Sequence, residues 1–124
     1  MAKRKITRTA LVKKLDKIFS EYIRRRNGEM VKCVTCGSTG HWKKMQAGHF
    51  MSRRHMSTRW HEDNVQVQCP KCNIWEQGQQ YAYSKFLGPK KSEELLQLSQ
   101  EIVKFTDQEL IEMIEQYQQK VNNL

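Results

Sequence analysis

Long apolar runs are missing from this 124-residue chain, and without about 18 consecutive apolar residues no segment is expected to span a membrane. The basic opening Met1–Lys5 is not followed by the apolar stretch that secretory signals carry, so we expect no export and a cytoplasmic location. Internal repeats and low-complexity linkers are also absent. With 38% hydrophobic residues, the sequence predicts one small domain over residues 1–124 with a modest core.

Acidic residues are scarce in the first half of the chain. Residues 1–60 contain sixteen Lys and Arg against three Asp and Glu, whereas residues 61–124 contain six against ten. The net charge of +9 is therefore concentrated in one half, a pattern typical of proteins that bind nucleic acid. Basic patches also bind anionic membranes, but no strongly hydrophobic insertion face accompanies this one. We therefore expect a nucleic-acid partner and no membrane partner.

Cysteine is limited to two pairs, Cys33-Val-Thr-Cys36 and Cys69-Pro-Lys-Cys72. Each pair presents two thiolates from a tight turn, and tetrahedral Zn²⁺ prefers soft sulfur ligands, so we predict a structural zinc ion bound by all four. Two structural disulfides are the alternative, which the absence of a secretory signal disfavours. The pairs are 32 residues apart, more than the roughly 15–20 of a zinc ribbon, so the zinc would close an insertion long enough to hold a functional loop.

A helix is predicted over residues 9–28, after a short basic arm at residues 1–8. Asn27-Gly28 is its stop signal, and its apolar positions recur at helical spacing: Leu11, Leu15, Ile18, Phe19, Tyr22 and Ile23. The run Arg24, Arg25 and Arg26 suits the negative end of the helix dipole. Three arginines exceed that need, so we expect them to bind nucleic-acid phosphates as well.

Residues 29–88 are predicted to form a zinc-closed finger with a strand–loop–strand–helix order. Its expected parts are a first zinc knuckle at Met30–Lys44, a short strand within Lys44–Phe50 that ends at His49, a loop over residues 51–64, a strand at Val65–Gln68 and a helix opened by Pro70. Trp60 and Trp75 are expected in the core rather than on a base-stacking surface.

Residues 89–124 are predicted to form two helices after Gly88-Pro89. The second begins at Thr106-Asp-Gln-Glu109, which has the sequence of a capping box. Because these helices are acidic, they are expected to serve as scaffold or dimer contacts rather than DNA contacts. The apolar positions of the first helix are Leu95, Leu98, Ile102 and Phe105.

The ordered set His49, Asn64 and Asn73, together with the four cysteines, resembles the ββα-metal nuclease finger, also called the His-Me or HNH finger. Within that superfamily the chain is most similar to phage recombination endonucleases of the NinG/Rap type, which act on branched DNA. The stretch Cys-Pro-Lys-Cys-Asn followed by Glu-Gln-Gly-Gln is also similar to the finger helix of junction resolvases of the endonuclease VII type. The resemblance runs from Cys33 to about Leu87 and includes Ala-Gly-His-Phe and Arg-Trp-His-Glu-Asp-Asn-Val-Gln-Val-Gln.

This resemblance implies a role for each of the three polar residues. His49 matches the general base that activates a water, a task that suits a pKa near neutrality. Asn64 matches the residue that braces the loop, and Asn73 matches a ligand of a catalytic Mg²⁺ or Mn²⁺. From residue type alone, the alternatives are a structural histidine, a turn asparagine and a helix-start side chain bonded to local backbone.

One position departs from the endonuclease VII pattern, because Gly48 stands where an Asp would precede the base histidine as a second metal ligand. One alternative is that Asn73, water and the substrate phosphate hold the ion. The other is a ligand from the loop, for which the candidates are His55, His61 and Asp63.

The loop between His49 and Asn64 also contains Arg53, Arg54 and Arg59. Guanidinium groups match phosphate oxygens and would stabilise the charge that grows on a phosphorus under attack. A generically basic loop is the alternative.

The sequence therefore predicts a small α+β fold, a zinc-stabilised ββα-metal finger with an N-terminal helix and C-terminal helices. The predicted function is a metal-dependent DNA endonuclease that cleaves recombination intermediates, such as Holliday junctions or D-loops, for a phage in its bacterial host cell. One rival is a non-catalytic zinc-finger accessory protein of recombination, and another is a zinc-scaffolded protein-interaction module, which leaves the basic half unexplained. Paired cuts across a junction would favour a twofold homodimer.

Overall fold

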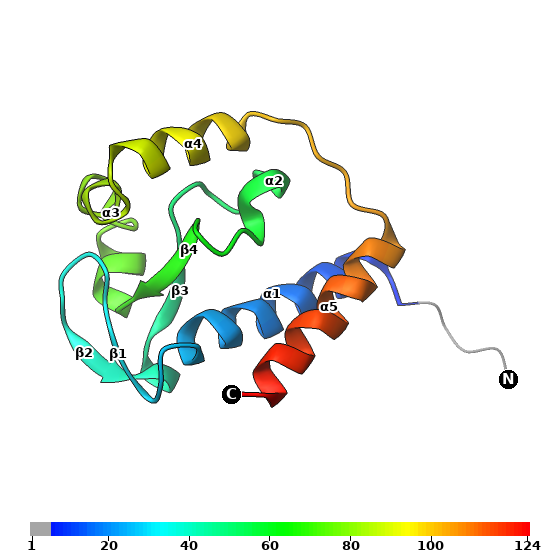
Figure 1. Ribbon diagram of the computed structural model, residues 1–124, viewed down its shortest axis with the longest axis horizontal. Helices are drawn as coiled ribbons and strands as arrows, with labels where there is room; N and C mark the ends of the chain where they lie inside the picture. Colours follow the sequence, from blue (N-terminus) through cyan, green and yellow to red (C-terminus); the bar gives the residue numbers. More distant parts are fainter. Residues whose placement is uncertain (1–5) are drawn as a thin grey trace, which may run out of the picture.

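The computed structural model describes residues 6–124, so the part of the predicted basic arm in residues 1–5 lies outside the described residues. Within this range the chain has a mixed α+β fold with five α-helices and two separate antiparallel sheets of two strands each (Figure 1). The elements are α1 (Arg8–Arg25), β1 (Met30–Lys32), β2 (Thr39–His41), β3 (Gln46–His49), α2 (Met56–Arg59), β4 (Val65–Gln68), α3 (Gln80–Leu87), α4 (Pro89–Ser99) and α5 (Asp107–Asn122), with a 3₁₀ turn at Trp42–Lys44 and a π-helical turn at Lys71–Trp75.

Local signals explain both ends of α1. The Thr7 hydroxyl caps its start by accepting a hydrogen bond from the Ala10 amide at 3.2 Å. The helix ends at Arg25, and Gly28 has a φ of 107°, a left-handed conformation that glycine adopts without strain. The chain therefore leaves the helix just before the Asn27-Gly28 stop signal and turns towards β1.

Helices α1 and α5 lie side by side and run in the same direction (Figure 1). Arg8 and Asp107 form an ion pair at 3.2 Å near the two N-termini, and Phe19 packs edge-on against Tyr117 with ring centroids 4.9 Å apart. Their apolar stripes form the main core together with Trp60 and Val65, so the core position predicted for Trp60 is confirmed. The buried members are Leu11, Leu15, Phe19, Ile23, Trp60, Val65, Leu110, Ile114 and Tyr117.

The two strands predicted on either side of the arginine-rich loop are present and pair with each other. β3 and β4 are antiparallel, with Gln46 opposite Gln68 and His49 opposite Val65. Since successive side chains of a strand point to opposite faces, His49 and its neighbour Gly48 lie on different faces of this hairpin. The first knuckle contains a second hairpin, in which Met30 of β1 is opposite His41 of β2.

Two segments of the finger differ from the sequence-based expectation. The predicted loop 51–64 contains the short helix α2, and the helix opened by Pro70 ends after one turn at Trp75. The break has a backbone cause, since Gln77, Gly78 and Gln79 all have positive φ, of 53°, 86° and 50°. The chain then starts again as α3.

Three apolar residues also lie elsewhere than predicted. The first C-terminal helix, α4, ends at Ser99, so Ile102 and Phe105 lie in the segment that leads to α5. Ile102 is 92% exposed, whereas Phe105 packs against Trp60 at 5.6 Å between ring centroids. Trp75 is 80% exposed, so its predicted core position is wrong. The capping box of α5 is confirmed, because Thr106 and Glu109 exchange both hydrogen bonds.

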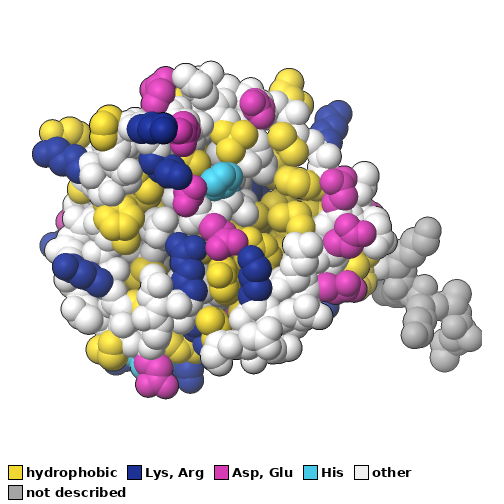
Figure 2. All heavy atoms as spheres, viewed as in Figure 1, with side chains coloured by type: hydrophobic (Ala, Val, Ile, Leu, Met, Phe, Trp, Pro, Cys, Tyr) yellow, Lys and Arg dark blue, Asp and Glu magenta, His cyan; other side chains and the backbone are white. Residues whose placement is uncertain are grey.

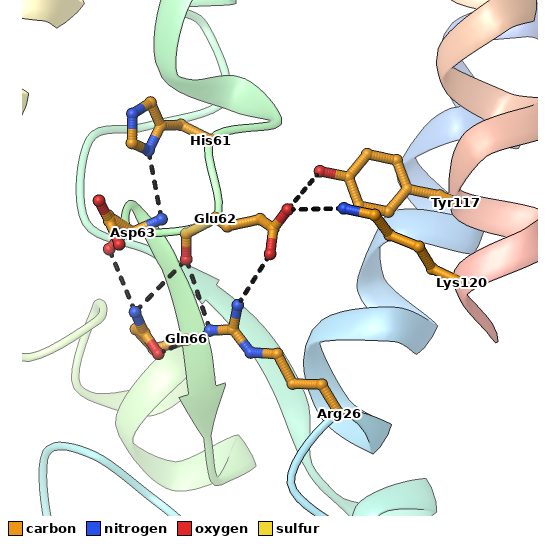
Figure 3. Close-up of polar contacts among 7 residues, drawn as sticks. All are labelled: Arg26, His61, Glu62, Asp63, Gln66, Tyr117 and Lys120. Atoms are coloured by element: carbon orange, nitrogen blue, oxygen red, sulfur yellow. Dashed lines mark hydrogen bonds and ion pairs between the residues drawn. The ribbon is translucent and has the colours of Figure 1, made fainter. Parts of the chain in front are cut away.

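Glu62, in the turn between α2 and β4, connects the end of α1 to α5 (Figure 3). Its carboxylate accepts hydrogen bonds from the Tyr117 hydroxyl at 3.0 Å and the Lys120 ammonium at 3.2 Å, and lies 3.5 Å from the Arg26 guanidinium. Arg26 also donates to Gln66 Oε1 at 3.0 Å. Partial burial raises the pKa of Glu62, but the bonds from Lys120 and Tyr117 and the charges of Lys120 and Arg26 outweigh it, so the pKa lies below 4.5.

We predict that Glu62 stabilises the fold above its ordinary pKa of 4.5 and loses this effect as the pH falls through the lower pKa of the folded state. Glu62→Gln should reduce the free energy of unfolding at neutral pH, and the difference from the parent protein should shrink as the pH falls below 4.5, because the parent carboxylate becomes protonated as the pH passes through its lowered pKa. Urea unfolding at neutral pH and at a series of acidic pH values measures this. Glu115→Gln, at an exposed position of α5, is the control, and an equal, pH-independent loss in both variants would contradict the prediction.

Candidate functional site

All four cysteine sulfurs converge between the two hairpins. Cys33 and Cys36 follow β1, whereas Cys69 and Cys72 follow β4, and the four sulfur atoms lie within 4.8 Å of one another. The Sγ atoms of Cys36 and Cys69 are 3.7 Å apart, which matches the edge of roughly 3.8 Å expected for a tetrahedron with Zn–S bonds of about 2.3 Å. All four are free cysteines, so the disulfide alternative is wrong. The cluster fits a four-coordinate metal such as zinc.

Local hydrogen bonds prepare some of these thiols for ionisation. Burial raises the pKa of Cys33, but bonds from the Thr35 hydroxyl and from nearby backbone amides outweigh it and bring that pKa to about 6. Burial and the neighbouring sulfurs raise the pKa of Cys72 to about 12. Four thiolates this close repel one another, so a bound cation is what would let all of them ionise together.

A pocket of about 610 Å³ lies between α1, β3 and the segment that follows the cysteine cluster. His49 and Asn73, which are 24 positions apart in the sequence, both line it. Asp16 and Arg24 contribute from α1, and Arg53 contributes from the loop after β3. The pocket therefore brings together one histidine, two arginines, one carboxylate and several amide side chains, Asn73 among them.

His49 is held in one tautomer. Its Nε2 lies 2.8 Å from the Arg59 carbonyl oxygen, which can only accept, so Nε2 carries the proton and Nδ1 is the acceptor of the neutral ring. Burial lowers the pKa of His49 below 6.5, and the charges of Arg53 and Arg59 lower it further against the opposing effects of that carbonyl and Asp16. The imidazole is therefore neutral at pH 7 and able to accept a proton.

Asn64 is fully buried and braces the loop that follows His49. Its Oδ1 accepts the Met51 amide at 2.8 Å, and its Nδ2 donates to the carbonyl oxygens of Met51 and Thr58, both at 3.0 Å. Its own carbonyl oxygen accepts the Phe50 amide at 2.8 Å. These four bonds tie both ends of the loop together behind the imidazole.

Asn73 lies on the π-helical turn, where its Nδ2 donates to Gln46 Oε1 at 2.7 Å and leaves Oδ1 as the atom it could offer to a cation. Asp16 is the carboxylate of the pocket, but Arg59 and the Trp60 indole bond its oxygens at 3.0, 2.6 and 2.9 Å. Within residues 6–124 the cysteine cluster is the one group of three or more His, Cys, Asp or Glu side chains arranged to hold a metal. The pocket therefore does not fit a Mg²⁺ or Mn²⁺ ion held by protein ligands alone.

The loop residues considered as substitutes for the missing Asp do not line this pocket. Asp63 forms an ion pair with Lys91 at 2.9 Å, which lowers the pKa of its carboxyl group. His61 Nδ1 accepts the Asp63 amide at 3.2 Å, and His55 precedes α2. A second ligand from this set is therefore not favoured by the geometry.

Packing leaves no room for a side chain at Gly48, the position where the resemblance expected an Asp. A Cβ atom at Gly48 would overlap Gln68 Oε1 and lie 2.6 Å from Gln68 Cδ. Gln68 is fully buried, and its Nε2 donates to the Gly78 carbonyl at 2.8 Å and to the Thr35 hydroxyl at 3.2 Å. Its Oε1 has no hydrogen-bond partner among the described residues. The space that an Asp side chain would need is therefore filled by Gln68.

The arginines predicted to bind phosphate fall into two groups. Arg26 and Arg59 are bonded to acidic side chains, Glu62 and Asp16, and their side chains are 19% and 18% exposed. These bonds give each of the two arginines a structural role. Their predicted role as phosphate ligands is not tested by the structure and stays a prediction. Arg53 lines the pocket, and although it lies 3.9 Å from Asp16 its side chain is 63% exposed; the neighbouring Arg54 is also exposed.

Arg24 and Arg25 gather around Trp42. Both guanidinium carbons lie 5.1 Å from the centroid of its ring, and the Lys43 ammonium lies 5.8 Å from it. Arg24 also lines the pocket, so this cluster and Arg53 put positive charge on two of its sides. Figure 2 shows a face of different character, on which Lys and Arg are interspersed with Asp and Glu.

Sequence reasoning did not identify Asp16 or Gln68 as parts of this site. Asp16 is a single acid on a basic helix, and Gln68 is one of two glutamines in an alternating strand, so neither has a local motif. A weak signal existed in the scarcity of acids, because Asp16 is one of three acidic residues in the first 60.

Comparison with known proteins identifies the family. Residues 2–124 match the family model described as Bacteriophage Lambda NinG protein, so the chain belongs to this family. Membership indicates a phage protein with a role related to recombination. Neither the curated proteins nor the solved structures yield a match. Each helix within residues 6–124 is too short or too polar to cross a membrane.

We predict that the protein purified under reducing conditions contains one zinc ion per chain, bound by Cys33, Cys36, Cys69 and Cys72. Cys72→Ser should lose the zinc and lower the thermal unfolding temperature, because Cys72 is buried and the cluster joins the two hairpins. Elemental analysis and thermal denaturation measure these effects. Ser38→Ala, which removes a hydroxyl 3.1 Å from Cys36 Sγ but no ligand, should keep the zinc. A zinc-free parent protein, or a mass that corresponds to two disulfides, would contradict this assignment.

Proposed function

We propose that the protein is a DNA endonuclease of the ββα-metal type that hydrolyses phosphodiester bonds in branched recombination intermediates, such as Holliday junctions or D-loops. The observation that carries this proposal is His49, a neutral imidazole with its tautomer fixed by the Arg59 carbonyl, in a pocket with arginines on two sides. The membership of a phage family related to recombination supports the same substrate class.

The order of elements around His49 agrees with this proposal. β3, the braced loop, β4 and the turn Lys71–Trp75 follow the strand–loop–strand–helix order of ββα-metal fingers, although the helical part is one turn long. Asn64 and Asn73 occupy the loop-bracing and ligand positions of that order. A twofold homodimer would supply the two sites needed for paired cuts across a junction.

In the proposed reaction, His49 Nδ1 accepts a proton from a water molecule as the water oxygen attacks the phosphorus. The bond from phosphorus to the leaving oxygen breaks, that oxygen takes a proton from a second water molecule, and His49 returns its proton to solvent. Arg24 and Arg53 would hold the phosphate and offset its growing negative charge, since guanidinium groups bond two phosphate oxygens at once.

A catalytic Mg²⁺ or Mn²⁺ remains part of the proposal only as an ion that binds together with DNA. Asn73 Oδ1 is a single neutral ligand, and Mg²⁺ usually keeps several waters and takes substrate phosphate oxygens as ligands. The free protein should therefore show no tight magnesium site.

A non-catalytic accessory protein of recombination is the second candidate function. Gly48 favours it, because the carboxylate of the related nuclease pattern is replaced by packed, uncharged Gln68. The accessory role does not explain why His49 has a fixed tautomer and a lowered pKa. The two candidates differ in whether DNA is cut, and both require that DNA is bound.

We predict that DNA binding depends on the cluster around Trp42. The double variant Arg24→Ala/Arg25→Ala should weaken binding and reduce the slope of log affinity against log salt by about 0.9 for each phosphate that the protein no longer neutralises. Lys90→Ala/Lys104→Ala removes the same charge from exposed positions that do not line the pocket and is the control. Titrations of fluorescent duplex DNA at several salt concentrations measure both. Equally weakened binding in the two double variants, or a salt slope near zero in the parent, would overturn the assignment.

We also predict that His49→Ala separates cleavage from binding. Because the imidazole is neutral at pH 7, the change removes the base without removing charge, so junction affinity should persist while the cleavage rate falls by about 10²–10⁴-fold. In the parent, cleavage should continue as the pH falls through 6.5 and stop only through the lower pKa of folded His49. Nicking assays on a four-way junction over a range of pH measure this.

His61→Ala, which alters a histidine outside the pocket, is the control for that experiment and should cut at nearly the parent rate. If His49→Ala cuts as fast as the parent, the endonuclease proposal fails. If the parent binds junctions but never cuts them with Mg²⁺ or Mn²⁺ present, the accessory role replaces it.

A further inference from the structure

Trp75 is 80% exposed in the structure, whereas Trp60 is buried in the main core. An aromatic side chain of this size normally stabilises a fold by burying its apolar surface, so an exposed Trp beside a pocket suggests a binding role. Its neighbour Ile74 is also exposed, to 57%. The surface after Asn73 is therefore apolar and open, in a protein with a net charge of +9.

Trp75 lies in a segment whose neighbouring residues line the pocket that contains His49. Asn73 and Gln77, two residues before and after it, both line that pocket. Two residues span at most about 7 Å between Cα atoms, so the indole is attached within one nucleotide's reach of the pocket wall. The Trp75 side chain is exposed to solvent and does not itself line the pocket.

Hydrogen bonds fix the backbone around Trp75. Gln77 and Gln79 adopt left-handed conformations that non-glycine residues rarely take, with Gly78 between them. The Gly78 amide donates to the Cys72 carbonyl at 2.7 Å, and the Gly78 carbonyl accepts Gln68 Nε2 at 2.8 Å. These bonds and the cysteine cluster fix the turn that presents the indole.

The charge around the exposed Ile74 and Trp75 indicates which kind of partner this surface binds. A second copy of the chain would bring another net charge of +9 to a rim that already has Arg24 and Arg53, so self-association through it is disfavoured. A partner with both negative charge and flat apolar faces fits better. Nucleotides that are not base-paired have both, because their bases are unstacked and their phosphates remain charged.

We propose that Trp75 stacks on an unpaired DNA base while the adjoining phosphates lie along the pocket. This rests on the proposed function and extends it, because it gives the protein a means to prefer DNA with single-stranded or opened segments over intact duplex. Stacking uses the π-face common to all bases, so the preference should not depend on sequence.

Binding measurements with the cleavage-deficient His49→Ala protein test this proposal without requiring catalysis. Trp75→Ala in that background should weaken binding to an oligothymidylate of about 12 nucleotides by roughly 5- to 100-fold, the usual effect of removing one stacking side chain. Affinity for a duplex of the same length should change by less than about twofold, since phosphate contacts dominate there. Ile102→Ala, which removes another exposed apolar side chain from the segment before α5, should change neither affinity.

Tryptophan fluorescence supplies a second measurement. Oligothymidylate should quench the emission of the parent and of Trp42→Phe, and this quenching should be absent in Trp75→Phe. Quenching that disappears with Trp42 instead, or an equal weakening for single strand and duplex in Trp75→Ala, would overturn the proposal while leaving the endonuclease assignment intact. If the protein without DNA has the mass of a dimer and the Trp75 indole is protected from solvent, the surface would instead bind a second copy of the chain. Absence of any DNA binding would contradict both proposals.

Discussion

Convergence of the four cysteine sulfurs is the constraint on which the pocket depends. The cluster joins the end of β1 to the end of β4, and Asn73 is the residue directly after Cys72. Without a bound metal, the turn that forms one wall of the pocket would be held mainly by the Asn73–Gln46 and Gln68–Gly78 hydrogen bonds. Each such bond contributes only about 0.5–1.5 kcal/mol, less than the free energy that a structural metal adds on binding.

Buried amide side chains also fix the loop between His49 and Asn64. Asn64, just before β4, and Gln68, the last residue of β4, are fully buried. Each bonds backbone groups of other segments. Leaving a buried polar group without its partner costs about 1–3 kcal/mol, so moving the loop away from Asn64 would be unfavourable. The position of the His49 imidazole is therefore an outcome of several bonds made far from it in sequence.

Features specified by neighbouring residues could be predicted from the sequence, and features made by distant partners could not. The cysteine pairs, the strands at His49 and Val65 and the capping box at Thr106 each have a local pattern, and all are present. The break after Trp75 has no local signature, because it depends on the left-handed Gln77 and Gln79 on either side of Gly78, whose amide and carbonyl bond Cys72 and Gln68. The pairing of Asp16 with Arg59 spans 43 positions and has no sequence signature.

The same distinction applies to Gly48. In the sequence it is only a missing carboxylate, whereas in the structure the space beside it is occupied by the side chain of Gln68. Gly48 and His49 lie on opposite faces of the β3–β4 hairpin. The Gly48 side is filled, since Gln68 occupies the space of a Cβ and the Tyr83 hydroxyl donates to the Gly48 carbonyl at 2.7 Å. A carboxylate there would be buried without a cation, which is strongly unfavourable. In the proposed function, the positive charge that would bind phosphate therefore comes from Arg24 and Arg53, which line the same pocket as His49 and belong to the basic first half of the chain.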